Sequence, residues 1–569
     1  MISRQSIGIV HSGHMPNHSF VTQTFKTRNF SAWGLGVFLL LPWLTPYTAG
    51  PTPNVWSWLL SALCAVFLSL FRRRLRPELV VHAWVLAAVI SALIGLVQYF
   101  GLAPALSPWI NQPQAGEAFA NLRQRNQFAT LTSIGLLALI GWLEMRTKAP
   151  HAEGWHLPVW AYLLALLLAL GNAASNSRTG LLQWALIAVL TACWALPGRK
   201  ALLVFALQAL LAYGVAVFTL PLLLEWVTGQ PSSGLFGRLV GDAPACTSRK
   251  ALWSNVLTLI GQKPWLGWGW GELDYAHFIT LYPGPRFCEI LDNAHNLPLH
   301  LAVELGIPAA VAICGGLGWM VWRGRPWREE NPVRQMAWGV LAVIGLHSLL
   351  EYPLWYGPFQ IAAALAVWLL FAAREAAPAI NSGFSLKFKQ NMPFAQYLRS
   401  LSAAIMIAIL ACVAVSYNRV SQIYLQPDQR SAAYRDDTLA KVSGSWVFRQ
   451  QARFAELSIM PLTPENAAAL HAMAIELLHY SPEPRVIEKV IESAVMLGRH
   501  DEALYYLVRY RAAFPKEHAR WARINAAPLA PSTQGRPQAF LPVHAGSTAS
   551  GLTLVGRCQW RPQPHSSSA

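Results

Sequence analysis

The chain has 569 residues, of which 54% are hydrophobic and only 12% are charged. A soluble domain carries roughly 25% charged residues, so this composition excludes an ordinary soluble enzyme and predicts a polytopic membrane protein. The 25 tryptophans agree with that class, because an apolar ring with one N–H group suits the interface between lipid and water. A formal net charge of +17 would also suit nucleic acid, so the positions of the basic residues have to decide that question.

Apolar runs long enough to cross a bilayer recur along the chain. A helix needs about 17–25 predominantly apolar residues for this. The sequence offers eleven such runs, at about 32–48, 55–71, 79–100, 126–145, 157–172, 180–196, 201–225, 297–322, 336–352, 358–373 and 400–416. The predicted fold is therefore all-α, a polytopic membrane protein with about eleven transmembrane helices.

The basic residues of the short loops alternate between the two sides of this arrangement. One side holds most of them, in the N-terminal tail and in loops at 72–76, 146–148, 199–200, 323–334 and 374–399. The short loops of the other side hold only Arg123, Arg125 and Arg178. By the positive-inside rule, the N-terminus is predicted to be cytoplasmic and the C-terminal region to lie outside the cytoplasm. The basic residues are thus explained as signals of membrane topology, and no nucleic acid is expected as a partner.

This topology divides the chain into six parts. Residues 1–30 are polar and lack the apolar core of a signal peptide. The predicted parts are a cytoplasmic tail at 1–31, N-terminal transmembrane helices at 32–225, a large periplasmic loop at 226–296, C-terminal transmembrane helices at 297–416, a periplasmic helical domain at 417–526 and a disordered tail at 527–569.

Two of the external parts carry specific signals. In the helical domain, "LGRHDEALYYLVRYRAAFP" is similar to half of a tetratricopeptide-type hairpin, which would suit docking of partner chains. The large loop contains Cys246 and Cys288. In an oxidising periplasm they would either form a disulfide or remain two free thiols, and their positions in the sequence favour neither alternative.

Polar residues form four groups at the external ends of the predicted spans. They occur in "NLRQRNQFATL", in "NAASNSRTGLLQW", in "CTSRKALWSNVLTLIGQKPWLGWGWGELDY", and in the pair formed by "DNAHNLPLH" and "GLHSLLEYPLWY". Ionisable residues at membrane depth are costly and by default suggest function. Because all four groups lie on the same predicted side, we expect them to form one site.

Each group also has a structural explanation. Arg178 could snorkel to the interface, and Arg123 and Arg125 could bind lipid phosphates. His300 could be a hydrogen-bonded core histidine, and His347 could satisfy Glu351 four residues further along the same helix face.

His295 is harder to explain structurally, because it precedes a helix among capping residues, where it is placed to accept a proton. A metal site is disfavoured, since His295 and His300 are five apart and no metal motif accompanies them.

The chemistry that fits these residue types is transfer from a lipid pyrophosphate. No phosphate-binding loop, dinucleotide fingerprint or serine-nucleophile motif appears in a suitable context, so an already activated donor is needed. A pyrophosphate leaving group requires cations at membrane depth, and arginine keeps its charge there better than lysine. Arg178 and Arg249, with Arg123 or Arg125, could supply these cations. His295 could deprotonate an acceptor hydroxyl that arrives from water.

At these residues the sequence resembles the O-antigen ligase and polymerase superfamily of bacterial inner-membrane glycosyltransferases. "AHNLPLHLAVELGIPA" looks like its His-Asn motif, while "SRTG" and "SRKALWSNVLTLIGQKPWLGWGWGEL" look like its two arginine motifs. "LRQRNQFATL", "HSLLEYPLWYGPF" and the helical C-terminal domain are similar to the PglL-type protein O-oligosaccharyltransferases, which glycosylate pilin.

The resemblance implies roles for particular residues. His295 would be the base, and Arg178 and Arg249 would bind an undecaprenyl-pyrophosphate-linked oligosaccharide, with Arg125 and Arg123 as further cations. Gln127, Asn296, Glu351 and Tyr352 would position donor or acceptor. The glycan would move en bloc to a Ser/Thr hydroxyl of a periplasmic protein such as pilin, with inversion and without metal or nucleotide cofactor. Lys250 directly follows Arg249, so either cation could face the phosphate.

Four other functions compete with this one. An O-antigen ligase would use lipid A core as acceptor, and a polymerase would use a second lipid-linked glycan. A transporter of lipid-linked glycan would place its polar groups near the bilayer midplane rather than at one face. A scaffold that recruits partners through the C-terminal domain would leave the arginine and histidine groups without a role.

Overall fold

The computed structural model describes residues 34–147 except 49 and 53, then 157–195, 200–229, 234–235, 237, 245–375 and 392–526. Within these ranges the chain forms α-helices and short 3-10 turns and no strand, so the all-α prediction is confirmed for the described part. The tails predicted at 1–31 and 527–569 lie outside the described residues.

Most of the chain is helical. An unlabelled helix covers Gly34–Leu44. The helices of the first half are α2 (Val55–Leu70), α3 (Pro77–Tyr99), α4 (Arg125–Thr147), α5 (Val159–Ala174), α6 (Arg178–Trp194) and α7 (Lys200–Thr228). Those of the middle are α9 (Arg249–Gln262), α10 (Leu273–Ile279), α11 (Leu297–Leu305), α12 (Ile307–Gly324), α13 (Pro332–Ser348), α14 (Gly357–Glu375) and α15 (Met392–Ser421). The C-terminal helices are α16 (Thr438–Ser443), α17 (Arg449–Ile459), α18 (Ala467–Leu478), α19 (Pro484–Met496), α20 (His500–Ala513) and α21 (Pro515–Ala526).

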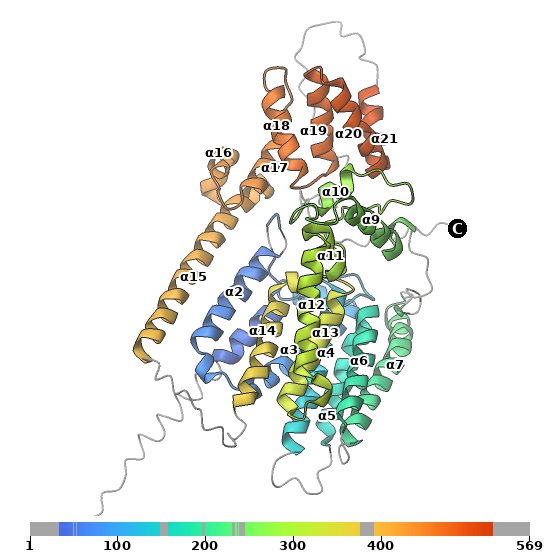
Figure 1. Ribbon diagram of the computed structural model, residues 1–569, viewed down its shortest axis with the longest axis vertical. Helices are drawn as coiled ribbons and strands as arrows, with labels where there is room; N and C mark the ends of the chain where they lie inside the picture. The colour runs from blue at the N-terminus through green and yellow to red at the C-terminus, as the bar shows by residue number, and fades with distance from the viewer. Residues whose placement is uncertain are drawn as a thin grey trace, which may run out of the picture.

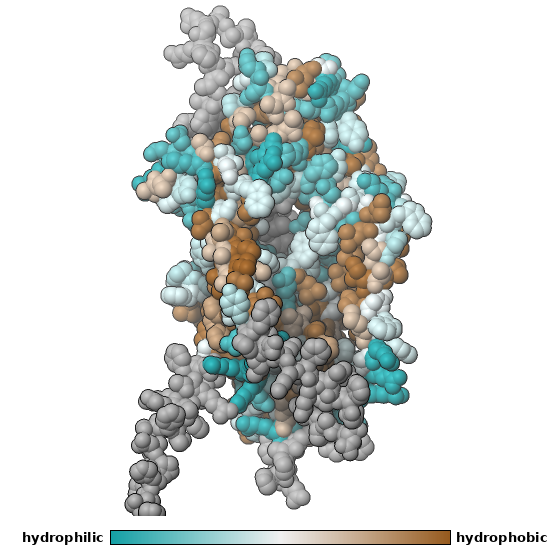
Figure 2. All heavy atoms as spheres, turned by 60° about the vertical axis from the view of Figure 1, so that its left-hand side comes forward, coloured by the Kyte–Doolittle hydropathy of each residue, from teal (hydrophilic) through white to brown (hydrophobic). Residues whose placement is uncertain are grey.

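Several of these helices are suited to a membrane. Four segments among the described residues are long and apolar enough to cross one: Pro77–Tyr99, Arg125–Arg146, Lys200–Thr228 and Gln396–Tyr424. Shorter apolar helices include α2, α5 and the greater part of α14. Each run predicted to span overlaps one helix or, at 297–322, two helices, and the crossing of a bilayer by all eleven stays a prediction. In Figure 2, apolar residues gather over the middle of the visible face and hydrophilic residues at its upper and lower ends.

Helix α4 is the centre of the helical bundle, with 89% of its apolar window buried inside the protein. Small residues let its neighbours approach closely. A Cβ on Gly135 would lie 2.3 Å from the Cβ of Ala88 in α3, and one on Gly171 in α5 would lie 2.7 Å from that of Ala92. Association of helices in lipid depends on such close packing, because lipid is as apolar as the side chains.

The helix expected over 297–322 is in fact two helices. The break is at Gly306, whose φ of 87° is in the left-handed region and where a Cβ would lie 2.1 Å from the carbonyl oxygen of Trp265. Only glycine fits this position, where the backbone between α11 and α12 packs against the turn that follows α9. Leu301 and Val303 of α11 pack into the core of the large loop with Leu252 of α9. His300 therefore lies in the loop rather than inside the span.

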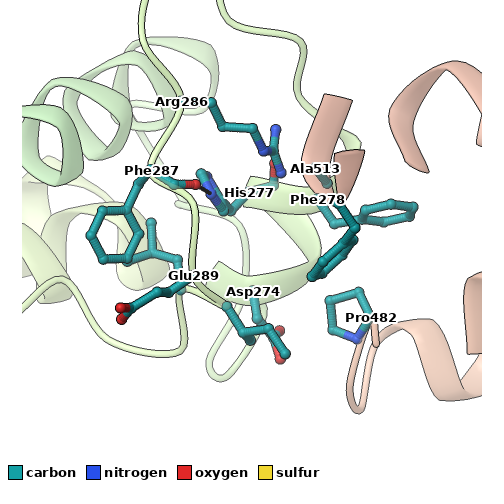
Figure 3. Close-up of a pocket in the computed structure, with 11 residues that line it drawn as sticks. Asp274, His277, Phe278, Arg286, Phe287, Glu289, Pro482 and Ala513 are labelled. Carbon is teal, nitrogen blue, oxygen red and sulfur yellow. Dashed lines mark hydrogen bonds between the residues drawn. The ribbon is translucent and has the colours of Figure 1, made fainter. Parts of the chain in front are cut away.

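The C-terminal helices sit on the large loop, which lies between them and the bundle (Figure 1). Helix α10 joins the two parts, because Leu273 belongs to the core of the loop and Phe278 to the core of the C-terminal helices. Arg509 of α20 donates to the carbonyl of Ile279 at 2.8 Å. Figure 3 shows the small pocket at this seam, where Phe278 comes from the loop and Pro482 from the C-terminal part. None of its lining residues is a predicted site residue.

Candidate active site at the ends of four helices

Three helices next to the predicted site begin in the same way. Arg123, Asn176 and His295 have φ values of 62°, 50° and 49°, and each lies two residues before a helix, α4, α6 or α11. Such left-handed residues other than glycine cost on the order of 1–3 kcal/mol and concentrate at functional sites. One residue separates each of them from its helix, and two of these residues, Ser177 and Asn296, cap the helix by accepting a backbone N–H.

The carboxylate of Glu351 joins these helix ends. One of its oxygens accepts from His295 Nδ1 at 2.6 Å, and the other contacts the Arg249 guanidinium at the first residue of α9. Asn126 Nδ2 of α4 is 3.3 Å from Glu351, and Ser177 Oγ donates to Asn126 at 2.7 Å. We call His295, Glu351, Arg249, Asn126 and Ser177 the lip cluster.

Glu351 lies three residues beyond the end of α13 and is buried. Burial acts to raise its pKa, but the hydrogen bond from His295 and the positive charge of Arg249 outweigh it and hold the pKa below its ordinary value. The carboxylate is then ionised and can only accept hydrogen bonds. His295 Nδ1 therefore donates in this hydrogen bond, so Nε2 is the ring nitrogen that remains to take up a proton.

The predicted cations occupy different positions. Arg249 forms an ion pair with Glu351, whereas Lys250 is exposed, so Arg249 is the cation of the lip cluster. Arg125 pairs with Glu117 of the preceding loop at 3.0 Å. Arg178 and Arg123 have exposed side chains, and no ion pair is formed by Arg178 with any described residue.

Arg125, Arg178 and Arg249 are each the first residue of a helix, where backbone N–H groups and the helix dipole favour anions.

The predicted positioning residues are only partly brought together. The Tyr352 ring lies edge-on to the His295 ring, with centroids 5.1 Å apart. Asn296 donates to the carbonyl of Leu349 at 3.0 Å and so ties the start of α11 to the end of α13. Gln127 is buried beside Asn126, and its amide nitrogen has no hydrogen-bond partner among the described residues. The structure therefore places Tyr352 and Asn296 at His295, whereas Gln127 is buried in the first turn of α4.

The expected pairing of His347 with Glu351 does not form. His347 Nδ1 is 2.8 Å from Thr130 Oγ1 of α4, and Gln183 of α6 donates to the same hydroxyl. Glu351 has turned away because α13 ends at Ser348 and the chain changes direction. Below the lip cluster lies a second group, the deep cluster, whose members are neutral hydroxyl, amide and imidazole side chains: Thr130, Thr132, Ser133, Asn172, Gln183 and His347.

Helix α9 also holds the segment that carries His295, and the sequence analysis did not predict this role for α9. Trp253 Nε1 donates to the carbonyl of Ala294 at 3.1 Å, directly before His295. Asn255 bonds the carbonyl of Pro285 at 3.0 Å and the N–H of Phe287 at 2.8 Å. A buried asparagine on an otherwise apolar helix face was the available signal.

The same segment is joined covalently to the residues before α9. Cys246 and Cys288 form a disulfide, with their Cα atoms 5.3 Å apart. The disulfide and the bonds of Trp253 and Asn255 therefore link the helix of Arg249 to the segment of His295.

Comparison with known proteins agrees with this geometry. Residues 163–314 match a family model described as O-antigen ligase, and this range contains Arg178, Arg249 and His295. Residues 118–143, with Gln127, match a protein glycosylation ligase model. Residues 335–527, with Glu351, match the C-terminal region of a virulence factor membrane-bound polymerase. The chain is related to the O-antigen ligases and the protein glycosylation ligases. The resemblance predicted from its motifs is thus confirmed.

Two relatives come from Acinetobacter baylyi. A general O-oligosaccharyltransferase is 25% identical over 293 residues, which are 50% of this chain and 49% of the relative. A ComP-specific O-oligosaccharyltransferase is 25% identical over 319 residues, 53% of this chain and 54% of the relative. The chain thus matches about half the length of these relatives, which are distant O-oligosaccharyltransferases.

Proposed function

We propose that the protein is an O-oligosaccharyltransferase that moves a preassembled glycan from undecaprenyl-pyrophosphate to a Ser/Thr hydroxyl of an acceptor protein such as pilin. The observation that carries the proposal is the Glu351 carboxylate, with His295 on one oxygen and Arg249 on the other. It places a candidate base beside a candidate phosphate-binding cation. The matches to protein glycosylation ligase and O-oligosaccharyltransferases support the same reaction class.

In this proposal His295 Nε2 takes the proton of the acceptor hydroxyl. The hydroxyl oxygen forms the new bond to the anomeric carbon as the bond from that carbon to the pyrophosphate oxygen breaks. The electron pair of the broken bond leaves with undecaprenyl-pyrophosphate, and direct displacement inverts the anomeric centre. Glu351 keeps Nδ1 protonated and stabilises the imidazolium that forms, which is the function of an orienting carboxylate. A general base of this kind contributes roughly 10²–10⁴-fold to the rate.

The pyrophosphate would lie against the helix starts. Arg249 and Arg178, each at the first residue of its helix, offer guanidinium groups together with backbone N–H donors. Such donors, fixed before the reaction, stabilise charge that develops on a leaving group. Arg123 is exposed beside the same helix ends, while Arg125 is held by Glu117 and fixes the loop in front of α4.

The distribution of basic residues supports an orientation. We propose that the large loop and the C-terminal helical domain lie in the periplasm and the basic loops, such as Arg325–Arg328 after α12, in the cytoplasm of a bacterial inner membrane. The acceptor would then approach from the aqueous side beneath the C-terminal domain, and the donor from the surrounding lipid. Tyr352, Asn296 and Gln127 would shape the space between the two.

Reconstitution tests the proposal. Purified protein in liposomes would receive undecaprenyl-pyrophosphate oligosaccharide and a candidate pilin, and the intact mass of the pilin would be measured. We expect a glycan-sized mass gain with the wild type and none with His295→Ala. His300→Phe is the matched control, because His300 is buried in α11 against the rings of Trp270 and Trp355 and its ring nitrogens make no hydrogen bond with any described residue. Full transfer by His295→Ala would refute the assigned base.

The acceptor is tested in the same experiment. Transfer to lipid A core but not to pilin would make the protein an O-antigen ligase with the same site. Joining of two lipid-linked glycans would make it a polymerase. No transfer to any of the three acceptors would contradict an enzyme and favour a transporter of lipid-linked glycan.

A further inference from the structure

The turn between α9 and α10 is fixed to the junction of α11 and α12. Trp268 and Gly269 donate their backbone N–H groups to Val303 and Glu304 at 2.9 Å and 3.0 Å, and Ile307 donates to Pro264 at 2.8 Å. The two backbones touch, since a Cβ on Gly267 would lie 2.3 Å from the carbonyl oxygen of Glu304. The position of this turn along the axis of α12 is therefore fixed by the first residue of α12.

Two large apolar side chains at the tip of this turn are exposed. Trp265 is 74% exposed and Leu266 is 85% exposed, although the backbone on both sides of them is tightly packed. Apolar surface left in water costs roughly 25 cal/mol per Å², and exposed apolar groups of this size on a rigid turn mark a contact surface.

Helix α12 shows what covers that surface. Its 18 residues span about 27 Å at 1.5 Å per residue, close to the thickness of a bilayer's hydrocarbon core. Ala310 is its only buried residue, and the apolar side chains of Val311 and Leu317 face outward. Arg323 and Arg325 mark its far end. Ile307 then lies at the opposite hydrocarbon boundary, and the turn bonded to it lies at the level of the lipid headgroups.

We propose that Trp265 and Leu266 insert into the membrane leaflet on the side of the large loop and anchor this loop to the bilayer. The occupant of the surface is bilayer lipid, because the turn is bonded to the first residue of α12, whose apolar side chains face outward. A tryptophan ring suits this depth, with its apolar body among acyl chains and its N–H toward the headgroups. Lys263 at the base of the turn, whose ammonium lies 4.0 Å from the Trp268 ring centroid, is placed to meet lipid phosphate.

The anchor bears on the candidate active site through α9. The turn follows the C-terminal end of this helix, and Arg249 is its first residue. Fourteen residues of rigid helix thus connect lipid contact at one end to the phosphate-binding cation at the other. The anchor keeps Arg249 at the height of a membrane-bound pyrophosphate. This consequence rests on the proposed function, whereas the lipid contact itself does not.

Fluorescence quenching tests the contact without any enzymatic readout. Leu266→Cys would be labelled with an environment-sensitive fluorophore in a variant that lacks Cys64, Cys193, Cys314, Cys412 and Cys558 but keeps the disulfide. The protein would be placed in liposomes with or without brominated phospholipid and without donor. We expect blue-shifted emission that the brominated lipid quenches at least twofold. Leu504→Cys, an exposed leucine of α20 in the C-terminal domain, is the matched control and should be unquenched.

Two outcomes would overturn the proposal. Emission at residue 266 that matches the control would show that the tip lies in water. Quenching that appears only after undecaprenyl-pyrophosphate is added would assign the surface to the donor's chain instead of the bilayer.

A Trp265→Ser/Leu266→Ser variant should raise the KM for the donor several-fold with kcat little changed. If the fluorophore is quenched but no variant transfers glycan, the anchor stands and the proposed reaction fails.

Discussion

The lip cluster and the deep cluster share three helices, yet they differ in charge. Both draw on α4, α6 and the region of α13, and Thr130 Oγ1 of the deep cluster donates to the backbone carbonyl of Asn126 in the lip cluster. The lip cluster contains Arg249 and His295 at helix N-termini and the Glu351 carboxylate beyond the end of α13, and Arg249 is partly exposed. The deep cluster contains only neutral donors and acceptors, each buried between helices.

The difference follows from the cost of charge in a low dielectric. An ionised group is stable at the helix ends, where dipoles, paired charges and water are at hand. In the deep cluster, one helical turn further from the helix ends, an ionised group would be unstable, and neutral hydrogen bonds join the helices to one another. We therefore expect changes in the lip cluster to alter transfer, and changes in the deep cluster to alter stability.

The largest effect is expected for Glu351→Gln. The amide cannot hold the charge of Arg249 or stabilise the imidazolium of His295, so kcat should fall by about 10²-fold or more. Transfer to pilin under saturating donor measures this. Glu117→Gln, which breaks the ion pair of Arg125 outside the cluster, is the control and should stay within a few-fold of the wild type.

The pH profile provides a second readout of Glu351. Because its folded pKa is held below the ordinary value, its interactions are intact above that pKa and are lost as pH falls through it. Wild-type transfer should therefore decline at acidic pH partly through this group. Glu351→Gln should lack that contribution, and an unchanged acid limb would contradict the role assigned to Glu351.

Arg249→Ala should lower kcat/KM for the donor by about 10²-fold, because one fixed donor to the leaving group is lost. Arg249→Lys should recover only part of this, since an ammonium cannot replace a planar two-pronged guanidinium. Lys250→Ala is the matched neighbour and should change donor kinetics less than twofold. Equal losses for both substitutions would mean that general positive charge, rather than the geometry at Glu351, binds the donor.

A smaller effect is expected for Trp253→Phe, which keeps the ring but removes the N–H that bonds Ala294. One hydrogen bond is worth about 1 kcal/mol, so kcat should fall roughly fivefold while the donor KM stays constant. Trp268→Phe removes an equivalent bond, to Leu259 at 3.0 Å, without touching the His295 segment. A similar loss of kcat in both variants would show a general weakening of the loop.

The smallest effect on transfer is expected for Gln183→Leu in the deep cluster. The substitution removes bonds to Thr130, to Ser133 and to the carbonyl of Val343. Hydrogen bonds between membrane helices are worth about 1 kcal/mol, so thermal unfolding in detergent should shift to a lower temperature. Transfer by the folded fraction should be unchanged. A loss of transfer without a loss of stability would place the deep cluster in the reaction itself.

Much of the site could be predicted because its chemistry is local in sequence. His295 and Glu351 stand out as ionisable groups where apolar runs begin or end, and that contrast needs no structure. The pairing of Glu351 could not be predicted. Helical spacing favoured His347 as its partner, but α13 ends before Glu351, and the chain carries the carboxylate across to α9 and α11. Trp253 was missed because an indole N–H gives no sign of which distant carbonyl it will reach.

The sequence by itself determined the all-helical class, the positions of the apolar runs and the residue types at their ends, because hydrophobicity and capping act over a few residues. Tertiary structure alone decided that α11 separates from α12, that Arg249 rather than Lys250 meets Glu351, and that the C-terminal helices rest on α10. Each depends on close contacts between segments far apart in the chain, such as Gly306 against Trp265. Such contacts arise from three-dimensional packing, which a local pattern does not encode.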